Sequence, residues 1–489
     1  MKIRSTQQTD ARSHSFFAFS GGSLEEIFAP LSAEQRQLAV SNLPEVESLS
    51  KVGETTSLSL ATNDGSLQIV VAGLGDPADF QWERLRKTVG KAFKEWERLK
   101  SPLVAVHLTG LPSGLAAADA ARTTAETTLL AAYRFDKYLS EKKTLAVDAV
   151  DIVAAEDVTS AVADGVVLAE TTIFARDLVN EPANVLSPAK LAEAAADAGK
   201  NYGFEVEISG RERIEELGMK AYLEVSRASA NEPKLIVMRY KGAPERPEDI
   251  IGLVGKGLTY DSGGLSIKPN DGMLFMKCDM GGAAAVIGAM AAIAKLKPKA
   301  NVTAVVAACE NMIAGNAYRP GDIIQSMAGK SIFIGSTDAE GRLTLADALT
   351  YIIEHEKAAK VVDVATLTGA AIIALGHVST AVVTNDQDFY RQLETASQVS
   401  GEKVWQLPNF DEYKELIKHK IADLSNTGGR AAGTVTAGLF VGEFAQKKPW
   451  LHLDIAGTAF SDKAEDYAPE GGKGVGVRLL YQLVKLLEQ

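Results

Sequence analysis

The first 160 or so residues alternate short apolar runs with amphipathic helical patterns. The runs LQIVVAGLG, LVAVHL and AVDIVAA are typical of buried strands, and QWERLRKTVGKAFKEWERLK has the spacing of an amphipathic helix. Strands that alternate with helices predict an α/β domain with a mostly parallel sheet. We therefore expect a smaller N-terminal α/β domain over residues 1–165.

A long helical pattern separates this region from a second one of similar character. The pattern runs from about Val158 through FARDLVNEPAN, where Pro182 and Pro188 interrupt it because proline cannot continue a helix interior. Nearly continuous apolar runs follow, as expected of strands buried on both faces: KLIVMRY, DIIGLVG, NVTAVVAA, KVVDVATL and WLHLDIA. The clearest helices between them are MGGAAAVIGAMAAIAKLK and LTLADALTYIIEHEK. These features predict a larger α/β domain over residues 166–489.

Composition and charge narrow the class of protein. The 489 residues are 46% hydrophobic and 23% charged, as in an ordinary globular protein of two or three domains. The net charge of −12 argues against nucleic acid or an anionic membrane as the main partner. With only Cys278 and Cys309, a disulfide framework is excluded and a reducing compartment is indicated.

The sequence predicts neither a secretory signal nor a membrane span. The N-terminal stretch MKIRSTQQTDARSHSFFAFSGG lacks an apolar run of about 7–15 residues. No stretch approaches about 18 consecutive apolar residues without a charge. We therefore expect a cytoplasmic protein with no membrane partner.

Five residues in glycine-rich segments carry the candidate chemistry. They are Lys256 and Asp261 in VGKGLTYDSGG, Asp279 in MKCDMGG, and Asp338 and Glu340 in GSTDAEGRL. Carboxylates supply the oxygen ligands that divalent cations prefer, and two cations about 3.5–4 Å apart need ligands shared between them. The one-zinc motif H-E-x-x-H is absent. The pattern therefore predicts two divalent metal ions held by carboxylates.

The segment GSTDAEGRL can bring three of its side chains together. Asp338 and Glu340 stand at i, i+2, Arg342 follows at i+4, and glycines lie on both sides. A non-helical loop of this kind can point both carboxylates at one centre, with Arg342 beside them. The alternative is that each acid is a solvated surface residue, and that Lys256 is a surface lysine following Gly255.

The order of the motifs indicates a family. VGKGLTYDSGG, SIKP, MKCDMGGAAA, STDAEGRLTLADAL, DVATLTGA and DIAGTA follow one another over roughly residues 175–480. This run resembles the leucyl aminopeptidase (M17, cytosolic aminopeptidase) family. The resemblance implies a macro-domain-like N-terminal domain with a role in assembly, and an α/β/α catalytic domain with a mostly parallel or mixed central sheet. It also implies a homohexamer.

The same resemblance implies an activity. The family consists of metal-dependent aminopeptidases, so we expect release of N-terminal residues, with leucine and other apolar residues preferred, from peptides with a free N-terminus. Two metal ions lower the pKa of a bridging water, polarise the scissile carbonyl and bind the substrate's α-amino group.

Ligand sets also follow from the resemblance. Lys256, Asp261, Asp279 and Glu340 are expected to hold one ion, and Asp261, Asp338 and Glu340 the other. An ammonium has no lone pair, so a ligating Lys256 requires adjacent dications that lower its pKa until the amine is neutral. Manganese or zinc, with magnesium or cobalt as alternatives, suit such a cage, because availability decides which ion enters a carboxylate-rich site.

Two further residues have expected catalytic roles in the resembled family. Lys268 in SIKP would stay protonated and stabilise the oxyanion of the tetrahedral intermediate. Arg342 would hold a bicarbonate that acts as general base, since its fork of donors suits a planar oxyanion. The alternatives are a solvated lysine in a Pro-Asn turn, and an arginine paired with Asp338 or Glu340.

The expected substrate pocket is assigned by the resemblance as well. Its lining is expected to comprise Met276, Ser336, Thr366, Leu367, Gly369 and Ala459. These residues would serve equally well as plain core. Ser336 stands where the family usually has asparagine, and a hydroxyl offers other donors and acceptors than an amide, so a substrate contact is expected to change.

Two functions from other classes compete with this interpretation. VVAGLGDPA contains G-x-G-x-x-A after a strand, as in dinucleotide-binding domains, but Pro77 lies within it and no acidic residue clearly ends a second strand at the required distance. Some members of the resembled family also have a DNA-regulatory role. An acidic chain without a Lys/Arg-rich block offers no support for that role.

Overall fold

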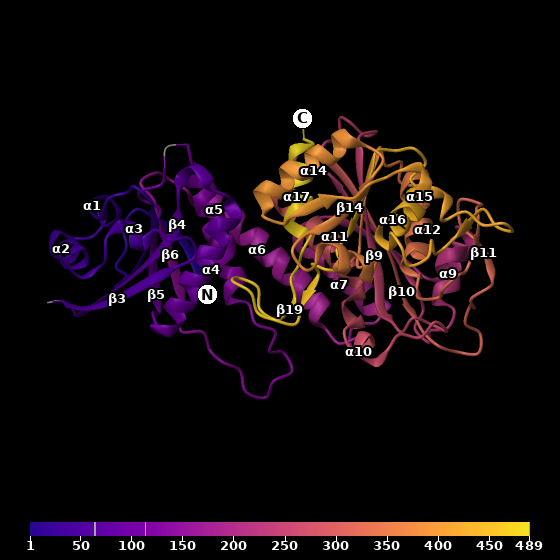
Figure 1. Ribbon diagram of the computed structural model, residues 1–489, viewed down its shortest axis with the longest axis horizontal. Helices are drawn as coiled ribbons and strands as arrows, with labels where there is room; N and C mark the ends of the chain where they lie inside the picture. Colours follow the sequence, from indigo (N-terminus) through magenta and orange to yellow (C-terminus); the bar gives the residue numbers. More distant parts are fainter. Residues whose placement is uncertain (63–64, 113, 489) are drawn as a thin grey trace. The chain divides into compact units, whose positions relative to one another are not determined.

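The chain forms two compact units in the computed structural model, which describes residues 1–62, 65–112 and 114–488 (Figure 1). The first unit comprises residues 1–170 and 463–469, and the second comprises 171–462 and 470–489. Helix α6 (Thr159–Asn180) contains this division and also the boundary expected after residue 165. The sequence pattern did not indicate that the short segment 463–469 belongs to the first unit.

The first unit is built on a six-stranded sheet in the order β1-β6-β5-β2-β4-β3. All neighbouring strands are parallel except β3, which is antiparallel to β4. The strands are β1 (Lys2–Thr6), β2 (Ser13–Phe19), β3 (Thr55–Thr62), β4 (Gly65–Gly75), β5 (Leu103–His107) and β6 (Ala149–Val153). The expected α/β class with a mostly parallel sheet is confirmed here.

Apolar side chains on both faces of this sheet hold its helices. Phe16 and Phe17 are consecutive in β2 and enter different hydrophobic clusters, as the alternation of a strand requires. The cluster of Phe17 includes Trp96, and that of Phe16 includes Phe28. The helices are α1 (Leu24–Ile27), α2 (Ala33–Asn42), α3 (Val46–Leu49), α4 (Trp82–Arg98) and α5 (Ala117–Ala132).

The second unit contains an eight-stranded sheet in the order β15-β14-β17-β13-β9-β10-β8-β7. The central strands β17, β13, β9 and β10 are mutually parallel, whereas β14, β8 and β7 join as antiparallel neighbours. The strands are β7 (Glu205–Ser209), β8 (Lys234–Lys241), β9 (Ile250–Asp261), β10 (Asn301–Asn311), β13 (Lys360–Ala365), β14 (Thr380–Thr384), β15 (Val404–Gln406) and β17 (Trp450–Asp454). This mixed sheet is the one expected.

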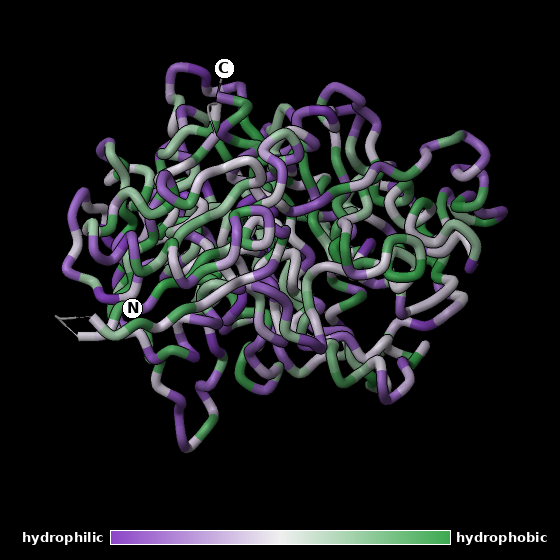
Figure 2. Tube along the Cα trace, turned by 60° about the vertical axis from the view of Figure 1, so that its left-hand side comes forward, coloured by the Kyte–Doolittle hydropathy of each residue, from purple (hydrophilic) through white to green (hydrophobic). Residues whose placement is uncertain are grey.

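Helices cover both faces of the second sheet (Figure 1), and Figure 2 shows hydrophobic stretches of the trace in the interior and hydrophilic stretches at the outer turns. Val254 of β9 packs in one hydrophobic cluster with residues of α9, α12 and α16, whereas its neighbour Gly255 approaches α11. The helices are α7 (Pro188–Tyr202), α8 (Arg211–Glu216), α9 (Lys220–Ser226), α10 (Asn270–Met273), α11 (Gly281–Leu296), α12 (Gly341–Glu354), α13 (Gly369–Leu375), α14 (Gln387–Ser400), α15 (Asp411–Glu415), α16 (Gly433–Gly442) and α17 (Val477–Leu486). Short strands complete the unit: β11 (Ile323–Gln325), β12 (Ser331–Phe333), β16 (Leu424–Ser425), β18 (Phe460–Ser461) and β19 (Gly471–Gly472).

Helix α11 is the apolar core helix beside the central strands. The segment Met276–Leu296 has the length and hydropathy of a membrane span, but 89% of its apolar window is buried inside the protein. A Cβ on Gly282 would lie 2.0 Å from the carbonyl oxygen of Val364 and 2.8 Å from the amide of Lys256. Glycine at this position therefore lets α11 begin directly against the strands that carry the candidate chemistry.

Candidate metal centre

A β-bulge in β9 places the first two candidate residues on one side of the sheet. The register between β9 and β10 shifts at Cys309 and Glu310, which pair with Leu258 and Tyr260, so Thr259 is an extra residue. An extra residue reverses the alternation of side chains. Lys256 and Asp261, which an unbroken strand would point to opposite faces, therefore both reach the same group of acids.

The structure brings all five predicted metal-site residues together. Oxygen atoms of Asp261, Asp338 and Glu340 lie within 4.8 Å of one another. Lys256 Nζ lies 2.7 Å from Oδ1 of Asp279 and 3.0 Å from Oε1 of Glu340. Asp279 comes from the 3₁₀ turn before α11, and Glu340 is the residue before α12. Except for Asp338, these side chains are buried.

Lys256 is enclosed by acceptors. Besides Asp279 and Glu340, its ammonium donates to the carbonyl oxygen of Thr366 at 2.9 Å. Burial by itself would lower the pKa of Lys256, but the charges of Asp279 and Glu340 outweigh it and raise the pKa. A nearby dication would act in the opposite direction. The interpretation as a surface lysine is wrong, because the side chain is inside the protein.

Lys268 forms two ion pairs within the same cluster. Its Nζ lies 2.8 Å from Oδ2 of Asp261 and 2.6 Å from Oδ1 of Asp338, and its side chain is 17% exposed. Burial would lower the pKa of Lys268, but the carboxylates, Asp261 first, raise it. The alternative of a solvated lysine in a turn is therefore wrong. Two reciprocal hydrogen bonds between Ser266 and Thr337 hold the Lys268 loop against the Asp338 loop.

The donor set fits divalent cations. Among the described residues, Oδ2 of Asp279 and Oε2 of Glu340 are buried oxygens without a hydrogen-bond partner. Burial, reinforced by the charge of Asp261, raises the pKa of Asp279 to about 6 and that of Glu340 to about 8. Unpaired buried oxygens and adjacent like charges both cost free energy, and a bound dication would relieve both costs. The residues therefore form a candidate metal site.

Arg342 lies beside the cluster in the first turn of α12. Its Nη1 donates to the carbonyl oxygen of Asn426 at 2.6 Å, and its buried Nε has no partner in the part of the chain that the structure describes. Within the described ranges, no ion pair joins Arg342 to Asp338 or Glu340, so that alternative is wrong for this structure. Burial lowers the pKa of Arg342 to about 10.

A cavity of about 630 Å³ opens beside this arginine. Asp338, Arg342 and Arg430 supply its charged groups. Its apolar wall consists of Leu367, Ala370, Ile373, Ala374, Leu407, Ala432 and Val435. The cavity therefore joins the acidic cluster to a surface that suits an apolar side chain.

The expected pocket residues divide into two groups. Leu367 and Gly369 line the cavity, whereas the lining among the described residues does not include Met276, Ser336, Thr366 and Ala459. Thr366 donates through Oγ1 to Oδ1 of Asp279 at 2.8 Å, and a Cβ built on Gly281 would lie 3.3 Å from both Thr366 and Ala459. Met276 begins the turn that carries Asp279. Ser336 accepts the backbone N–H of Asp338 at 3.2 Å.

Comparison with known proteins shows the family to which the chain belongs. The model of the cytosol aminopeptidase family catalytic domain matches residues 173–481, and that of the family's N-terminal domain matches residues 20–142. The chain belongs to the cytosol aminopeptidase family. It is thus a metallo-exopeptidase of the leucyl aminopeptidase (M17) type, as the motifs indicated.

Relatives and solved structures agree with this membership. A probable cytosol aminopeptidase of Clostridium perfringens is 52% identical over 438 residues, covering 88% of this chain and 89% of the relative. One from Alkaliphilus oremlandii is 49% identical over 446 residues, covering 90% and 89%. The bottromycin maturation enzyme BotP superposes with a TM-score of 0.85 at 32% identity, over 98% of this chain and 99% of BotP. A complex of BotP with Mn gives the same score and identity, over 98% and 100%.

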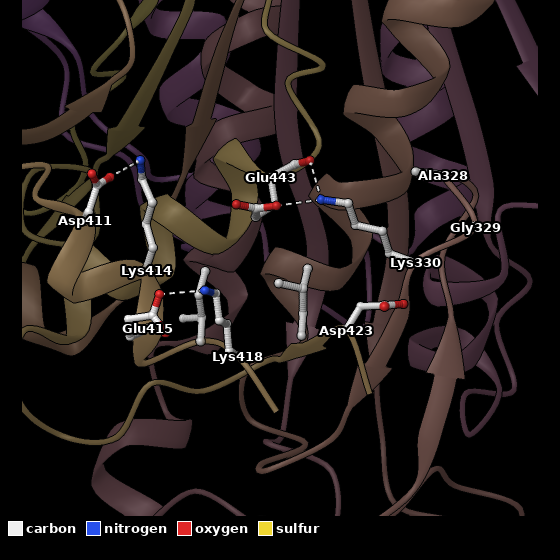
Figure 3. A pocket seen from close by; sticks show the side chains of 11 residues that line it. Ala328, Gly329, Lys330, Asp411, Lys414, Glu415, Lys418, Asp423 and Glu443 are labelled. Atoms are coloured by element: carbon white, nitrogen blue, oxygen red, sulfur yellow. Dashed lines mark hydrogen bonds and ion pairs between the residues drawn. The ribbon is translucent and has the colours of Figure 1, made fainter. Parts of the chain in front are cut away.

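This aminopeptidase also has a cavity apart from the metal centre. A second cavity, of about 710 Å³, is lined by charged side chains from α15, from the loops before β12 and β16, and from the end of α16 (Figure 3). Its lysines already have carboxylate partners: Lys330 with Glu443, Lys414 with Asp411 and Lys418 with Glu415. None of its lining residues is a predicted site residue, so this cavity is separate from the metal centre.

The glycine-rich loop of the first unit does not have the form of a dinucleotide site. β4 ends at Gly75, and a three-residue 3₁₀ turn, Pro77–Asp79, separates it from α4, which begins only at Trp82. Oδ1 of Asp76 accepts the N–H of Ala78 at 2.8 Å. A dinucleotide loop instead presents free N–H groups at the start of a longer helix.

Sequence reasoning missed the residues that hold the site together. Asn311, at the end of β10, donates through Nδ2 to Oδ1 of Asp261 at 2.8 Å and to the carbonyl oxygen of Thr337 at 3.0 Å. Asn426 contacts the Asp338 loop and Arg342. No spacing in the sequence could have revealed them, because their partners lie far away along the chain.

Proposed function

We propose that this chain removes N-terminal residues from peptides with a free α-amino group, using a centre of two divalent metal ions. The observation that carries the proposal is the convergence of four carboxylates and a buried lysine, with unpaired carboxylate oxygens, in a chain of the cytosol aminopeptidase family. Lys256, Asp261, Asp279 and Glu340 would hold one ion, and Asp261, Asp338 and Glu340 the other.

The choice of ion rests on ligand type and on a relative. Manganese is the first candidate, because the relative BotP has been solved with Mn, and zinc follows, with magnesium or cobalt as alternatives. When bound, such ions supply Lewis-acid chemistry that lowers the pKa of water, polarises a carbonyl and attracts a neutral amine.

Lys268 would stabilise the oxyanion. The carboxylates of Asp261 and Asp338 raise the pKa of Lys268, so its ammonium stays protonated at neutral pH and keeps donors available. An oxyanion donor that is already in place contributes about 10²–10³-fold to the rate. The hydrogen bonds between Ser266 and Thr337 keep this ammonium beside the acids.

Arg342 would hold a bicarbonate as general base. One arm of its guanidinium is fixed by the carbonyl of Asn426, while Nε has no partner among the residues described. The remaining donors form a planar fork that matches a planar oxyanion. Arg342 also lines the cavity together with Asp338, so an anion held there would lie beside the acidic cluster.

The substrate's apolar side chain would lie among Met276, Ser336, Thr366, Leu367, Gly369 and Ala459. Leu367 and Gly369 line the cavity with its apolar wall, which supports a preference for leucine and other apolar residues. The hydroxyl oxygen of Ser336 accepts a hydrogen bond from the backbone N–H of Asp338. The contact that an asparagine at this position would make with substrate would therefore be changed.

Assembly and location belong to the same proposal. We propose a homohexamer in which the N-terminal domain, residues 1–165, contributes to assembly beside a catalytic domain of residues 166–489. A cytoplasmic location is supported by the relatives named probable cytosol aminopeptidases and by the burial of the one helix, among the described residues, that is long and apolar enough to cross a membrane.

Recognition of a free N-terminus tests the proposed function. A leucyl peptide and its N-acetylated form are offered to the same enzyme with Mn²⁺ present, and the released amino acid is quantified. Turnover of the acetylated peptide should be nearly absent, because an acetylated nitrogen is neither basic nor free to bind. Equal cleavage of the two peptides would mean a metallohydrolase of another kind.

A further inference from the structure

The loop that carries Asp338 is bound on both sides by one buried amide. Asn426, 0% exposed, accepts through Oδ1 from the N–H of Gly335 at 2.8 Å and of Ser336 at 3.4 Å. Its Nδ2 donates to the carbonyl oxygens of Ser336 at 2.7 Å and Ala339 at 3.3 Å. The amide therefore spans the turn from its first residue to the residue before Glu340.

The backbone of Asn426 extends this contact to both neighbours of the loop. Its N–H donates to the carbonyl of Phe333 in β12 at 3.0 Å, and its own carbonyl accepts from Nη1 of Arg342 at 2.6 Å. One residue thus contacts the strand before the loop, the loop itself and the first turn of α12 after it.

The loop has little backbone support of its own. Among the described residues 335–339, the internal backbone hydrogen bonds consist of one long bond, from Ala339 N to Ser336 O at 3.4 Å. Ser336 Oγ adds a bond to Asp338 N, and Thr337 is bound to the Lys268 loop. On the α12 side, the shape of the turn therefore depends on Asn426.

We propose that Asn426 is a positioning residue of the metal centre. Its side-chain amide sets where Asp338 and Glu340 lie, and its carbonyl sets the orientation of Arg342. Residues that orient metal ligands influence metal affinity without touching the ion. This inference rests on the proposed function, because it assumes that Asp338 and Glu340 bind metal.

The same protein offers a matched control. Asn301 is 6% exposed and also binds a loop through its side chain, donating to the carbonyls of Ala243 at 2.7 Å and Arg246 at 2.8 Å and accepting from Ala243 N at 3.1 Å. It begins β10, whereas Asn311, which contacts Asp261, ends it. Loss of Asn301 therefore removes comparable hydrogen bonds at the end of the strand away from the metal centre.

The test compares Mn²⁺ affinity in metal-stripped, full-length protein. Wild type, Asn426→Ala and Asn301→Ala are titrated against a chelating indicator, with thermal unfolding measured alongside. Both variants should melt at lower temperature, but only Asn426→Ala should bind Mn²⁺ roughly 10–100-fold more weakly. Wild-type affinity in Asn426→Ala, or equal weakening in both variants, would overturn the inference.

Two further results keep the test decisive. If Asn426→Ala does not fold, Asn426→Ser and Asn301→Ser replace the pair, since a hydroxyl is too short to bond both ends of the turn, and the same difference in affinity is expected. If wild type binds no Mn²⁺ or Zn²⁺, the proposed function itself fails. If wild type binds metal and Asn426 variants bind it equally well, only the role of Asn426 fails.

Discussion

Lys256 and Asp279 form an ion pair inside the protein, with Nζ 2.7 Å from Oδ1 and side chains that are only 3% and 6% exposed. A buried ion pair is stable only when further hydrogen bonds compensate for lost water. The carbonyl of Thr366 supplies one for Lys256, but the second oxygen of Asp279 has no partner among the described residues. That oxygen is the reason to regard the pair as part of a metal centre rather than as a structural bridge.

Replacing Glu340 should remove metal together with activity. Glu340 is proposed to bridge both ions, and a neutral amide is a far weaker bridging ligand than a carboxylate. Glu340→Gln should therefore contain less metal by elemental analysis and should not hydrolyse a leucyl-amide substrate. Retention of both ions in Glu340→Gln would contradict the assignment.

Lys268→Ala is the contrasting variant in the same cluster. It should keep its metal content and its KM, but kcat should fall by about 10²–10³, equivalent to about 2.7–4 kcal/mol of transition-state stabilisation. If this variant loses metal instead, Lys268 is a support of the centre and not the oxyanion donor.

Substituting each of two arginines that line the same cavity distinguishes specific bicarbonate binding from a general effect of positive charge. Arg342 is buried and fixed by Asn426, whereas Arg430 is exposed. In bicarbonate-depleted buffer, added bicarbonate should raise kcat of wild type and of Arg430→Ala. Arg342→Ala should keep its metal, have a lower kcat and respond little to bicarbonate. A full response in Arg342→Ala would show that this arginine does not hold the anion.

A buried histidine pair should make the first unit sensitive to acid. His14 Nδ1 lies 2.9 Å from His107 Nε2, and burial lowers the pKa of His14 to about 4 and that of His107 to about 3, from 6.5. The folded chain keeps both rings neutral, whereas the unfolded chain protonates them below pH 6.5. As the pH is lowered from about 6.5 to the folded-state pKa values, the free energy of unfolding should therefore decrease. The decrease should be up to about 1.4 kcal/mol per pH unit for each ring.

Thermal unfolding between pH 7 and pH 5 checks this sign. His107→Leu should lose less stability on acidification than wild type, because one ring that unfolding would protonate is gone. The exposed His355 supplies the comparison variant, His355→Gln, which also lacks one histidine but leaves the buried pair in place. An equal slope in wild type and His107→Leu would contradict the assignment.

Much of the fold follows from local pattern. The runs DIIGLVG and NVTAVVAA predict β9 and β10 because strands covered on both faces are apolar throughout. Periodicity could not place the bulge at Thr259, because the extra residue is defined only by its pairing with β10. Without that bulge, the alternation rule would have pointed Lys256 and Asp261 to opposite faces.

The site was predictable to the extent that its chemistry lies in contiguous motifs. TDAEGRL identifies Asp338, Glu340 and Arg342 together, but Asn426 reaches Arg342 from 84 residues away along the chain. In the sequence, a buried asparagine that hydrogen-bonds to the backbone of a distant loop cannot be told from any other polar loop residue. Such positioning residues become visible only once tertiary contacts are known.

The central claim is that hydrolysis depends on metal bound at this carboxylate cluster. The most direct measurement is hydrolysis of a leucyl-amide substrate by protein stripped with chelator, with metal removal verified by elemental analysis, before and after addition of Mn²⁺ or Zn²⁺. We predict no turnover without metal and recovery on its addition. Full turnover by the verified metal-free protein would contradict the account.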